Sequence, residues 1–214
     1  APAVLGYCMG GLLALGLAAR RPDEVAALAL LATPWDFDGI PIANRQALAA
    51  IMPGLEAAMS LSNFLPVDLL QALFALLDPW LTVRKFRRFA DDSGGEGAGL
   101  FVALEDWLND GVPLVAPVAR ETLQGWYGEN APGKGAWKVA GDIVDPAKID
   151  TPALLFIPSR DHIVPPATAW PLANALLRAE ARAVPAGHIG MIAGGRGKEL
   201  VFDPLVDWFQ QVMN

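Results

Sequence analysis

Residues 1–19 carry no charged side chain, yet three glycines interrupt this apolar run between positions 6 and 11. A run of this length could form a short transmembrane helix. A secretory signal is disfavoured, because its basic residues should precede the apolar run, whereas Arg20 and Arg21 follow it. Closely spaced glycines favour a different structure, in which a short strand passes through a tight turn into a helix.

The turn itself reads Gly6-Tyr7-Cys8-Met9-Gly10. This is the Gly-x-nucleophile-x-Gly pattern, which places a nucleophile on a strained turn between a strand and a helix. We expect the small residues on either side to let that turn pack closely. The sulfur then lies beside a helix N-terminus, which favours the thiolate, and the N–H of Met9 becomes one oxyanion-hole donor. A buried structural cysteine in a glycine-rich turn is the alternative.

The pattern of the two ends of the chain is that of alternating strands and helices. Val25–Ala32 and Ala153–Pro158 are continuously apolar, as expected for strands buried on both faces of a parallel sheet. Further expected elements are a short strand at Ala3–Leu5, helices at Gly10–Arg20 and Ala167–Leu177, a strand at Ala181–Val184 and an amphipathic helix at Leu200–Met213. This alternation predicts an α/β fold with a mostly parallel sheet and flanking helices.

The middle of the chain has helical spacing instead and no strong strand signal. Proline-containing breaks at Pro53-Gly54, Pro66 and Pro79 separate the expected helices Gln46–Met52, Leu55–Leu61 and Val67–Leu77, and Asp91–Gly99 is expected to be a flexible loop. We therefore expect a helical cap insertion at residues 39–140, between core segments 1–38 and 141–214.

Two later residues complete a candidate triad with Cys8. Asp161 follows the apolar strand Ala153–Pro158, at the position of a triad acid, although a solvated loop carboxylate is the alternative. His188 lies between glycines, which allow a loop to present an imidazole into a cleft, and we prefer it to His162 because His162 directly follows the acid. The chain order nucleophile, acid, base is that of α/β-hydrolases.

Composition restricts the remaining functions. With 53% hydrophobic and 18% charged residues, the 214-residue chain is globular, and its net charge of −7 disfavours nucleic-acid binding. One cysteine and two histidines exclude a Cys-rich zinc site, so we expect no metal. Gly128–Gly135 resembles a phosphate loop but lacks Ser or Thr after Lys134 and has no preceding strand. The basic run Arg84–Arg88 is better explained as a solvated helix face than as a site for substrate phosphates.

These residues resemble the poly(3-hydroxyalkanoate) synthase family. The similar segments are GYCMGG at Gly6–Gly11, LATPWDF at Leu31–Phe37, WLNDGVPL at Trp107–Leu114, WYGENAPGKG at Trp126–Gly135, SRDHIVPP at Ser159–Pro166 and AGHIG at Ala186–Gly190. Dienelactone hydrolases share the cysteine elbow, but their compact fold has no room for the long segment between Cys8 and Asp161. The resemblance implies an α/β-hydrolase fold, here without its N-terminal strands, with Cys8, Asp161 and His188 as catalytic residues.

The same resemblance implies an activity and its setting. A (R)-3-hydroxyacyl-coenzyme A would acylate Cys8, and polyhydroxyalkanoate would grow from it, with coenzyme A as part of the substrate and no separate cofactor. The implied partners are this substrate, the growing polyester, a granule surface and, as one candidate assembly, a homodimer, with a cytoplasmic location and no transmembrane segment. The alternatives are a cysteine-dependent hydrolase of esters or thioesters and a non-catalytic relative that binds granules or a partner.

Overall fold

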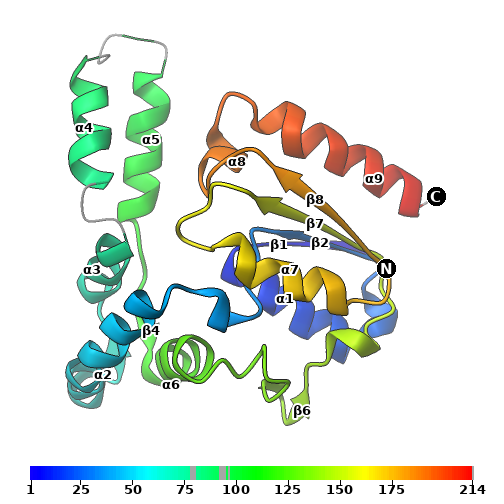
Figure 1. Ribbon diagram of the computed structural model, residues 1–214, viewed down its shortest axis with the longest axis horizontal. Coiled ribbons are helices and arrows are strands. Elements are labelled where there is room, and N and C mark those ends of the chain that lie inside the picture. Colours follow the sequence, from blue (N-terminus) through cyan, green and yellow to red (C-terminus); the bar gives the residue numbers. More distant parts are fainter. Residues whose placement is uncertain (78–80, 92–94, 96, 214) are drawn as a thin grey trace. The chain divides into compact units, whose positions relative to one another are not determined.

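The computed structural model describes residues 1–77, 81–91, 95 and 97–213 (Figure 1). Contacts divide the chain into two compact units. The core unit comprises Ala1–Arg45 and Gly125–Asn214, and the helical unit comprises Gln46–Gln124. The helical unit lies within the range 39–140 that the sequence analysis assigned to the insertion, and it is shorter at both ends.

The core unit contains a parallel sheet with its helices, and a small hairpin. Its elements are β1 (Ala3–Tyr7), α1 (Met9–Arg20), β2 (Ala27–Leu31), β5 (Lys138–Val139), β6 (Asp142–Ile143), β7 (Ala153–Pro158), α7 (Pro166–Ala175), β8 (Ala179–Val184), α8 (Gly190–Ala193), a π-helical segment (Lys198–Phe202), α9 (Asp203–Met213) and short 3₁₀ turns at Pro22–Glu24, Phe37–Gly39 and Pro146–Lys148.

The helical unit begins within a long helix that starts in the core unit. Its elements are α2 (Ile42–Ser62), β3 (Phe64–Leu65), α3 (Val67–Leu77), α4 (Leu81–Asp91), α5 (Ala98–Asn109), β4 (Leu114–Val115) and α6 (Ala116–Arg120), and a π-helical segment (Glu121–Gly128) leads back to the core unit. Leu55, Met59 and Leu65 are among the buried residues of its own small core.

The main sheet has the strand order β1-β2-β7-β8, and every pair in it is parallel. All residues of β2 and β7 are buried, as expected for central strands covered on both faces. Because the strands run in one direction, their carboxyl ends lie along one edge of the sheet, where α/β proteins place their sites. Cys8, Asp161 and His188 all follow strands at this edge.

Alternate residues of the central strands enter two separate cores. Leu28 and Leu155 pack with residues of α1 and α7, whereas Ala29 and Phe156 pack with residues of α8 and α9. In Figure 1, α1 and α7 accordingly lie on one side of the sheet and α9 on the other. The period of two along each strand thus produces three layers, and the α/β fold with a parallel sheet and flanking helices that the sequence predicted is confirmed.

Two expected elements have the predicted bounds, whereas some of the predicted breaks between helices were wrong. The strand Ala153–Pro158 and the helix Val67–Leu77 match, while β1 continues two residues past Leu5. Pro53 does not break the helix, since α2 continues through it to bury Leu55 and Met59. Packing of these side chains offsets the hydrogen bond that a proline cannot donate. Asp91 is the last residue of α4 and Ala98–Gly99 begin α5, so both ends of the predicted loop Asp91–Gly99 are helical. Most of the rest of that loop and the predicted break at Pro79 lie outside the described residues.

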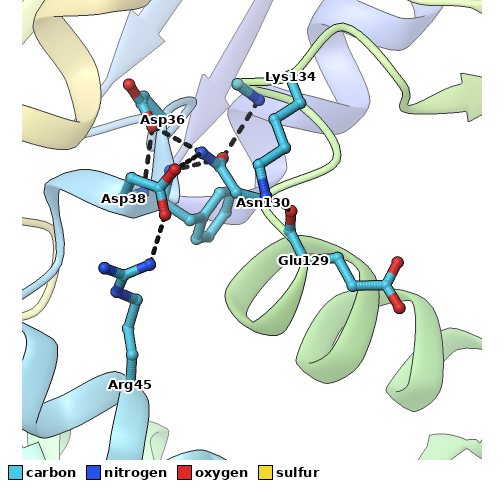
Figure 2. Close-up of polar contacts among 8 residues, drawn as sticks. Asp36, Asp38, Arg45, Glu129, Asn130 and Lys134 are labelled. Carbon is cyan, nitrogen blue, oxygen red and sulfur yellow. Dashed lines mark hydrogen bonds and ion pairs between the residues drawn. The ribbon is translucent and has the colours of Figure 1, made fainter.

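A polar network in the core unit joins the segment that follows β2 to the segment that follows the helical unit (Figure 2). The buried side chain of Asn130 lies at its centre. The amide nitrogen donates to Oδ1 of Asp36 over 2.8 Å and to Oδ2 of Asp38 over 2.9 Å, and the amide oxygen accepts from the N–H of Phe37 over 2.9 Å. Arg45 forms an ion pair with Asp38. The segment Gly128–Gly135, whose sequence resembles a phosphate loop, is therefore fixed by the hydrogen bonds of its residue Asn130.

Candidate active site

Cys8 occupies the turn between β1 and α1 in a conformation that side-chain-bearing residues rarely adopt. Its backbone has φ 54° and ψ −129°, a region that costs on the order of 1–3 kcal/mol. Two hydrogen bonds hold the turn: the N–H of Cys8 donates to Leu31 O over 2.8 Å, and its carbonyl accepts from the N–H of Gly11 over 3.0 Å. This is the strained strand-to-helix turn that the sequence predicted.

The close packing around the turn involves Gly6, as expected, but Gly11 in place of Gly10. A Cβ at Gly6 would lie 2.5 Å from Gly11 Cα, and one at Gly11 would overlap the side chain of Thr33. By contrast, no described atom lies within 4 Å of a Cβ at Gly10. Of the two glycines in the pattern, only Gly6 is required for packing in this structure, and Gly11 takes the second place.

Asp161 is buried at the carboxyl end of β7, with 4% of its surface exposed. Its Oδ1 accepts hydrogen bonds from the N–H groups of Ile163 and Val164, both over 2.8 Å. These two donors fix the carboxylate plane and leave Oδ2 for a further partner. The solvated-loop alternative does not describe this residue, since two backbone donors and burial hold it in place.

His188 provides that partner. Its Nδ1 lies 2.6 Å from Oδ2 of Asp161, and 7% of its surface is exposed. Backbone pairing beyond the strand ends brings the two loops together, because the N–H of Arg160 donates to Ala186 O over 3.0 Å. His162, the competing histidine, is exposed.

Opposing effects set the charge of His188. Burial lowers its pKa, but hydrogen bonds to Asp161 and to Cys8, together with the charges of both, raise the pKa to about 9. Because Nδ1 faces Asp161, the ring nitrogen left for Cys8 is Nε2. The structure thus brings Cys8, His188 and Asp161 together in the arrangement from which a thiol can pass its proton to an imidazole.

Met9, the expected oxyanion donor, is the first residue of α1. The first N–H groups of a helix have no acceptor within it, so the N–H of Met9 is available beside Cys8.

Within the part of the chain that is described, no three His, Cys, Asp or Glu side chains gather as metal ligands would. Tyr7 also contacts His188, through its ring and its hydroxyl, although no sequence pattern indicated a role for it. The sequence signal that could have indicated this contact is the position of Tyr7 directly before the nucleophile Cys8.

The fold and this site can be compared with known proteins. The model of the alpha/beta hydrolase fold family matches residues 1–194, most of the chain. The chain belongs to the alpha/beta hydrolase fold family. Solved structures agree: over 98% of this chain, a non-heme bromoperoxidase BpoC from Mycobacterium tuberculosis gives a TM-score of 0.59 at 20% identity, with 67% of that protein covered. A hydrolase from Oleispira antarctica, olei00960, gives 0.57 at 12% identity over 97% of this chain and 64% of its own.

Curated relatives show which proteins with this fold the chain resembles in sequence. The poly(3-hydroxyalkanoate) polymerase subunit PhaC of Haloarcula marismortui is 27% identical over 97% of this chain, and that of Haloferax mediterranei is 28% identical over 97%. These alignments cover 45% and 43% of the two relatives, so the chain spans about half the length of the curated relatives it matches. The PhaC of Synechocystis is 27% identical, with 57% of it covered. The chain is thus a PhaC-like alpha/beta hydrolase domain.

The uncharged N-terminal run can now be placed. It forms β1 and most of α1, with the turn at Cys8 between them. Among the residues that the structure describes, no helix is both long and apolar enough to cross a membrane.

Proposed function

We propose that this domain transfers (R)-3-hydroxyacyl groups from coenzyme A to a growing polyester through an acyl-Cys8 intermediate. The observation that carries the proposal is the buried His188–Asp161 pair, with a 2.6 Å contact, beside a cysteine on a strained turn. Similarity to PhaC proteins over 97% of the chain supports this choice of substrate.

In the first half-reaction, the proton of the Cys8 thiol already resides on Nε2 of His188, because the pKa of about 9 favours the protonated imidazole at neutral pH. The Cys8 thiolate attacks the thioester carbonyl carbon. Negative charge develops on the carbonyl oxygen, where the N–H of Met9 can donate a hydrogen bond. The bond from carbon to the coenzyme A sulfur breaks, and the departing thiolate takes the proton from His188. An acyl-cysteine and free coenzyme A result. A thiol suits this exchange, because attacking and leaving groups are similar in energy.

In the second half-reaction, the hydroxyl of another hydroxyacyl unit attacks the acyl-cysteine and gives its proton to His188. The carbon–sulfur bond to Cys8 breaks as the new ester bond forms, and the proton returns to the Cys8 sulfur. Asp161 holds His188 in one tautomer and stabilises its charged form in both steps. No cofactor beyond the coenzyme A of the substrate takes part in this scheme.

The setting of this chemistry is part of the proposal. The substrate is a hydroxyacyl-coenzyme A and the product a polyester, so we place the protein in the cytoplasm, on the surface of polyester granules, with a homodimer as the proposed assembly. A fluorescent fusion in cells that accumulate polyester should concentrate on the granules, and light scattering of the purified protein should give twice the monomer mass. A diffuse signal or a monomer mass would contradict the corresponding part.

Incubation of the intact natural protein with 3-hydroxybutyryl-coenzyme A tests the activity. We expect oligoester among the products and an added hydroxyacyl mass on the peptide that contains Cys8, the one cysteine of this sequence. Cys8→Ala should abolish both, whereas Cys8→Ser should retain at most slight turnover, because a serine hydroxyl is a weaker nucleophile at neutral pH. Free hydroxy acid without oligoester would favour a hydrolase instead. Normal turnover in Cys8→Ala would exclude Cys8 as the nucleophile, whereas a wild type that forms neither oligoester nor free hydroxy acid would favour the non-catalytic alternative.

A further inference from the structure

Tyr7 makes two separate contacts with His188, although the two residues are 181 positions apart. Its hydroxyl donates to the backbone carbonyl of His188 over 3.1 Å. Its ring lies against the imidazole, with ring centroids 4.8 Å apart and planes inclined by 31°. Tyr7 is the last residue of the edge strand β1, where it pairs in register with Leu31 of the buried strand β2, so the sheet anchors both contacts.

These contacts restrict motions of His188 that Asp161 leaves open. The hydrogen bond from Nδ1 to Asp161 holds one edge of the imidazole and gives no support to the faces of the ring. The loop that carries His188 has Gly187 on one side and joins α8 at Gly190 on the other, and glycine gives a backbone more conformational freedom than other residues do. Tyr7 supplies a surface for one face of the ring and a donor for the backbone that carries it.

The chemistry of a phenol fits both contacts. Burial raises the pKa of Tyr7, with the charges of Cys8 and Asp161 adding to the effect, so the hydroxyl keeps its proton and remains a donor at neutral pH. The face of an aromatic ring carries partial negative charge and favours a neighbouring cation. The titratable groups around His188 are thus Asp161, Cys8 and Tyr7, and the first two also favour its protonated form.

We propose that Tyr7 is a positioning residue, which holds the imidazole of His188 in the orientation that directs Nε2 at the Cys8 thiol. The proposal rests on the Cys8–His188 pairing of the proposed function and assigns Tyr7 no contact with substrate. Each turnover needs His188 to meet Cys8 repeatedly in the same geometry, and a misplaced base slows such proton transfers strongly.

Alkylation of Cys8 tests the proposal without any acyl substrate. Iodoacetamide reacts with the thiolate, whose sulfur attacks the methylene carbon as iodide leaves, and in the 214-residue chain only one cysteine can react. Rates would be measured from pH 5.5 to pH 9.5 for wild type, Tyr7→Phe, Tyr7→Leu and His188→Ala. His162→Ala is the control, because His162 is exposed.

At pH 6.5 we expect Tyr7→Phe, which loses only the hydroxyl, to react about two- to tenfold more slowly than wild type. Tyr7→Leu also loses the ring contact and should be slower still, with the acid limb of its profile displaced toward that of His188→Ala. His162→Ala should match wild type. Tyr7→Phe preserves size and burial, so it carries the test if Tyr7→Leu does not fold.

Proton NMR of the two histidines gives a second measurement, with His162→Ala identifying the signals. The pH midpoint of His188 should fall in both Tyr7 variants, a change that general loss of stability would not produce. Wild-type alkylation and an unchanged His188 midpoint in Tyr7→Phe and Tyr7→Leu would overturn the role of Tyr7. If His188→Ala itself alkylated like wild type, the Cys8–His188 pairing would fail, and the role of Tyr7 with it.

Discussion

The side-chain amide of Asn130 donates to Oδ1 of Asp36 over 2.8 Å, although the two residues are 94 positions apart in the chain. The backbone of Asn130 has φ 56°, a left-handed conformation that asparagine tolerates better than most residues. Its side chain is buried and also bonds Phe37 and Asp38. Both the backbone and the side chain of this position therefore favour asparagine.

Replacing Asn130 by alanine should destabilise the core unit substantially. The change removes three strong hydrogen bonds and leaves the N–H of Phe37 without its acceptor, so we expect the free energy of unfolding to fall by about 2–4 kcal/mol. Asn63 is a matched control, because it has φ 61° but is exposed, and Asn63→Ala should cost only about 1 kcal/mol of backbone strain. Urea denaturation measures both, and equal losses would contradict the importance of the network.

Two adjacent glycines in α1 should respond differently to alanine. Gly11→Ala places a methyl group against Thr33 and should lower the free energy of unfolding by about 1–3 kcal/mol. Gly10→Ala meets open space and should be neutral or stabilising by up to about 1 kcal/mol, because alanine favours a helix. Thermal unfolding of the two variants decides the matter. A larger loss in Gly10→Ala would refute the assignment of the close contact to Gly11.

The stability that His188 contributes should depend on pH in a defined direction. Its pKa is raised from 6.5 to about 9 in the folded protein, so folding favours its protonated form. The contribution is complete below about pH 6.5 and is lost as the pH rises through about 9, and its size is on the order of 3 kcal/mol.

Denaturation of wild type and His188→Gln over this pH range measures the effect. The difference between the two free energies of unfolding should be largest at the acidic end and shrink toward alkaline pH. His162→Gln serves as the matched variant at an exposed site. A difference that grows with pH would mean that His188 is buried in its neutral form.

The two histidines should differ sharply in catalysis. His188→Ala removes the proposed base, and we expect the rate of Cys8 acylation by 3-hydroxybutyryl-coenzyme A to fall about 10²–10⁴-fold in the intact protein. His162→Ala changes an exposed side chain and should leave the rate nearly unchanged. Single-turnover release of coenzyme A measures acylation directly. The opposite ranking would assign the role of base to His162.

The elements of the core unit could be predicted because short stretches of sequence, such as apolar runs and glycine turns, largely determine them. Ala153–Pro158 is apolar at every position, and its short length favours a strand covered on both faces over a buried helix. The turn at Cys8 was predictable because a sharp strand-to-helix turn requires a small residue such as Gly6. Cys8, Asp161 and His188 each follow a predicted strand in the sequence. Parallel strands have their carboxyl ends at one edge of the sheet, so these three residues were predicted to lie close together.

Contacts between distant side chains were not predictable in the same way. The bonds of Asn130 to Asp36 and of Tyr7 to His188 depend on which loops meet in space, and no local period encodes this. Pro53 failed as a break because burial of Leu55 and Met59 outweighed local propensity. The requirement at Gly11 rather than Gly10 depends on Thr33, which lies on the neighbouring segment after β2.

Strands β2 and β7 are neighbours in the sheet, yet the entire helical unit lies between them in the chain. Closing so long a loop is slow during folding, because the two strands must find each other across a large contour distance. The entropic cost, however, grows only logarithmically, and doubling the loop adds about 0.6 kcal/mol. The hydrogen bond from Phe37 to Asn130 closes this loop near its base, across 93 positions. The sheet is therefore thermodynamically tolerant of changes in the length of the helical unit, while its folding rate depends on them.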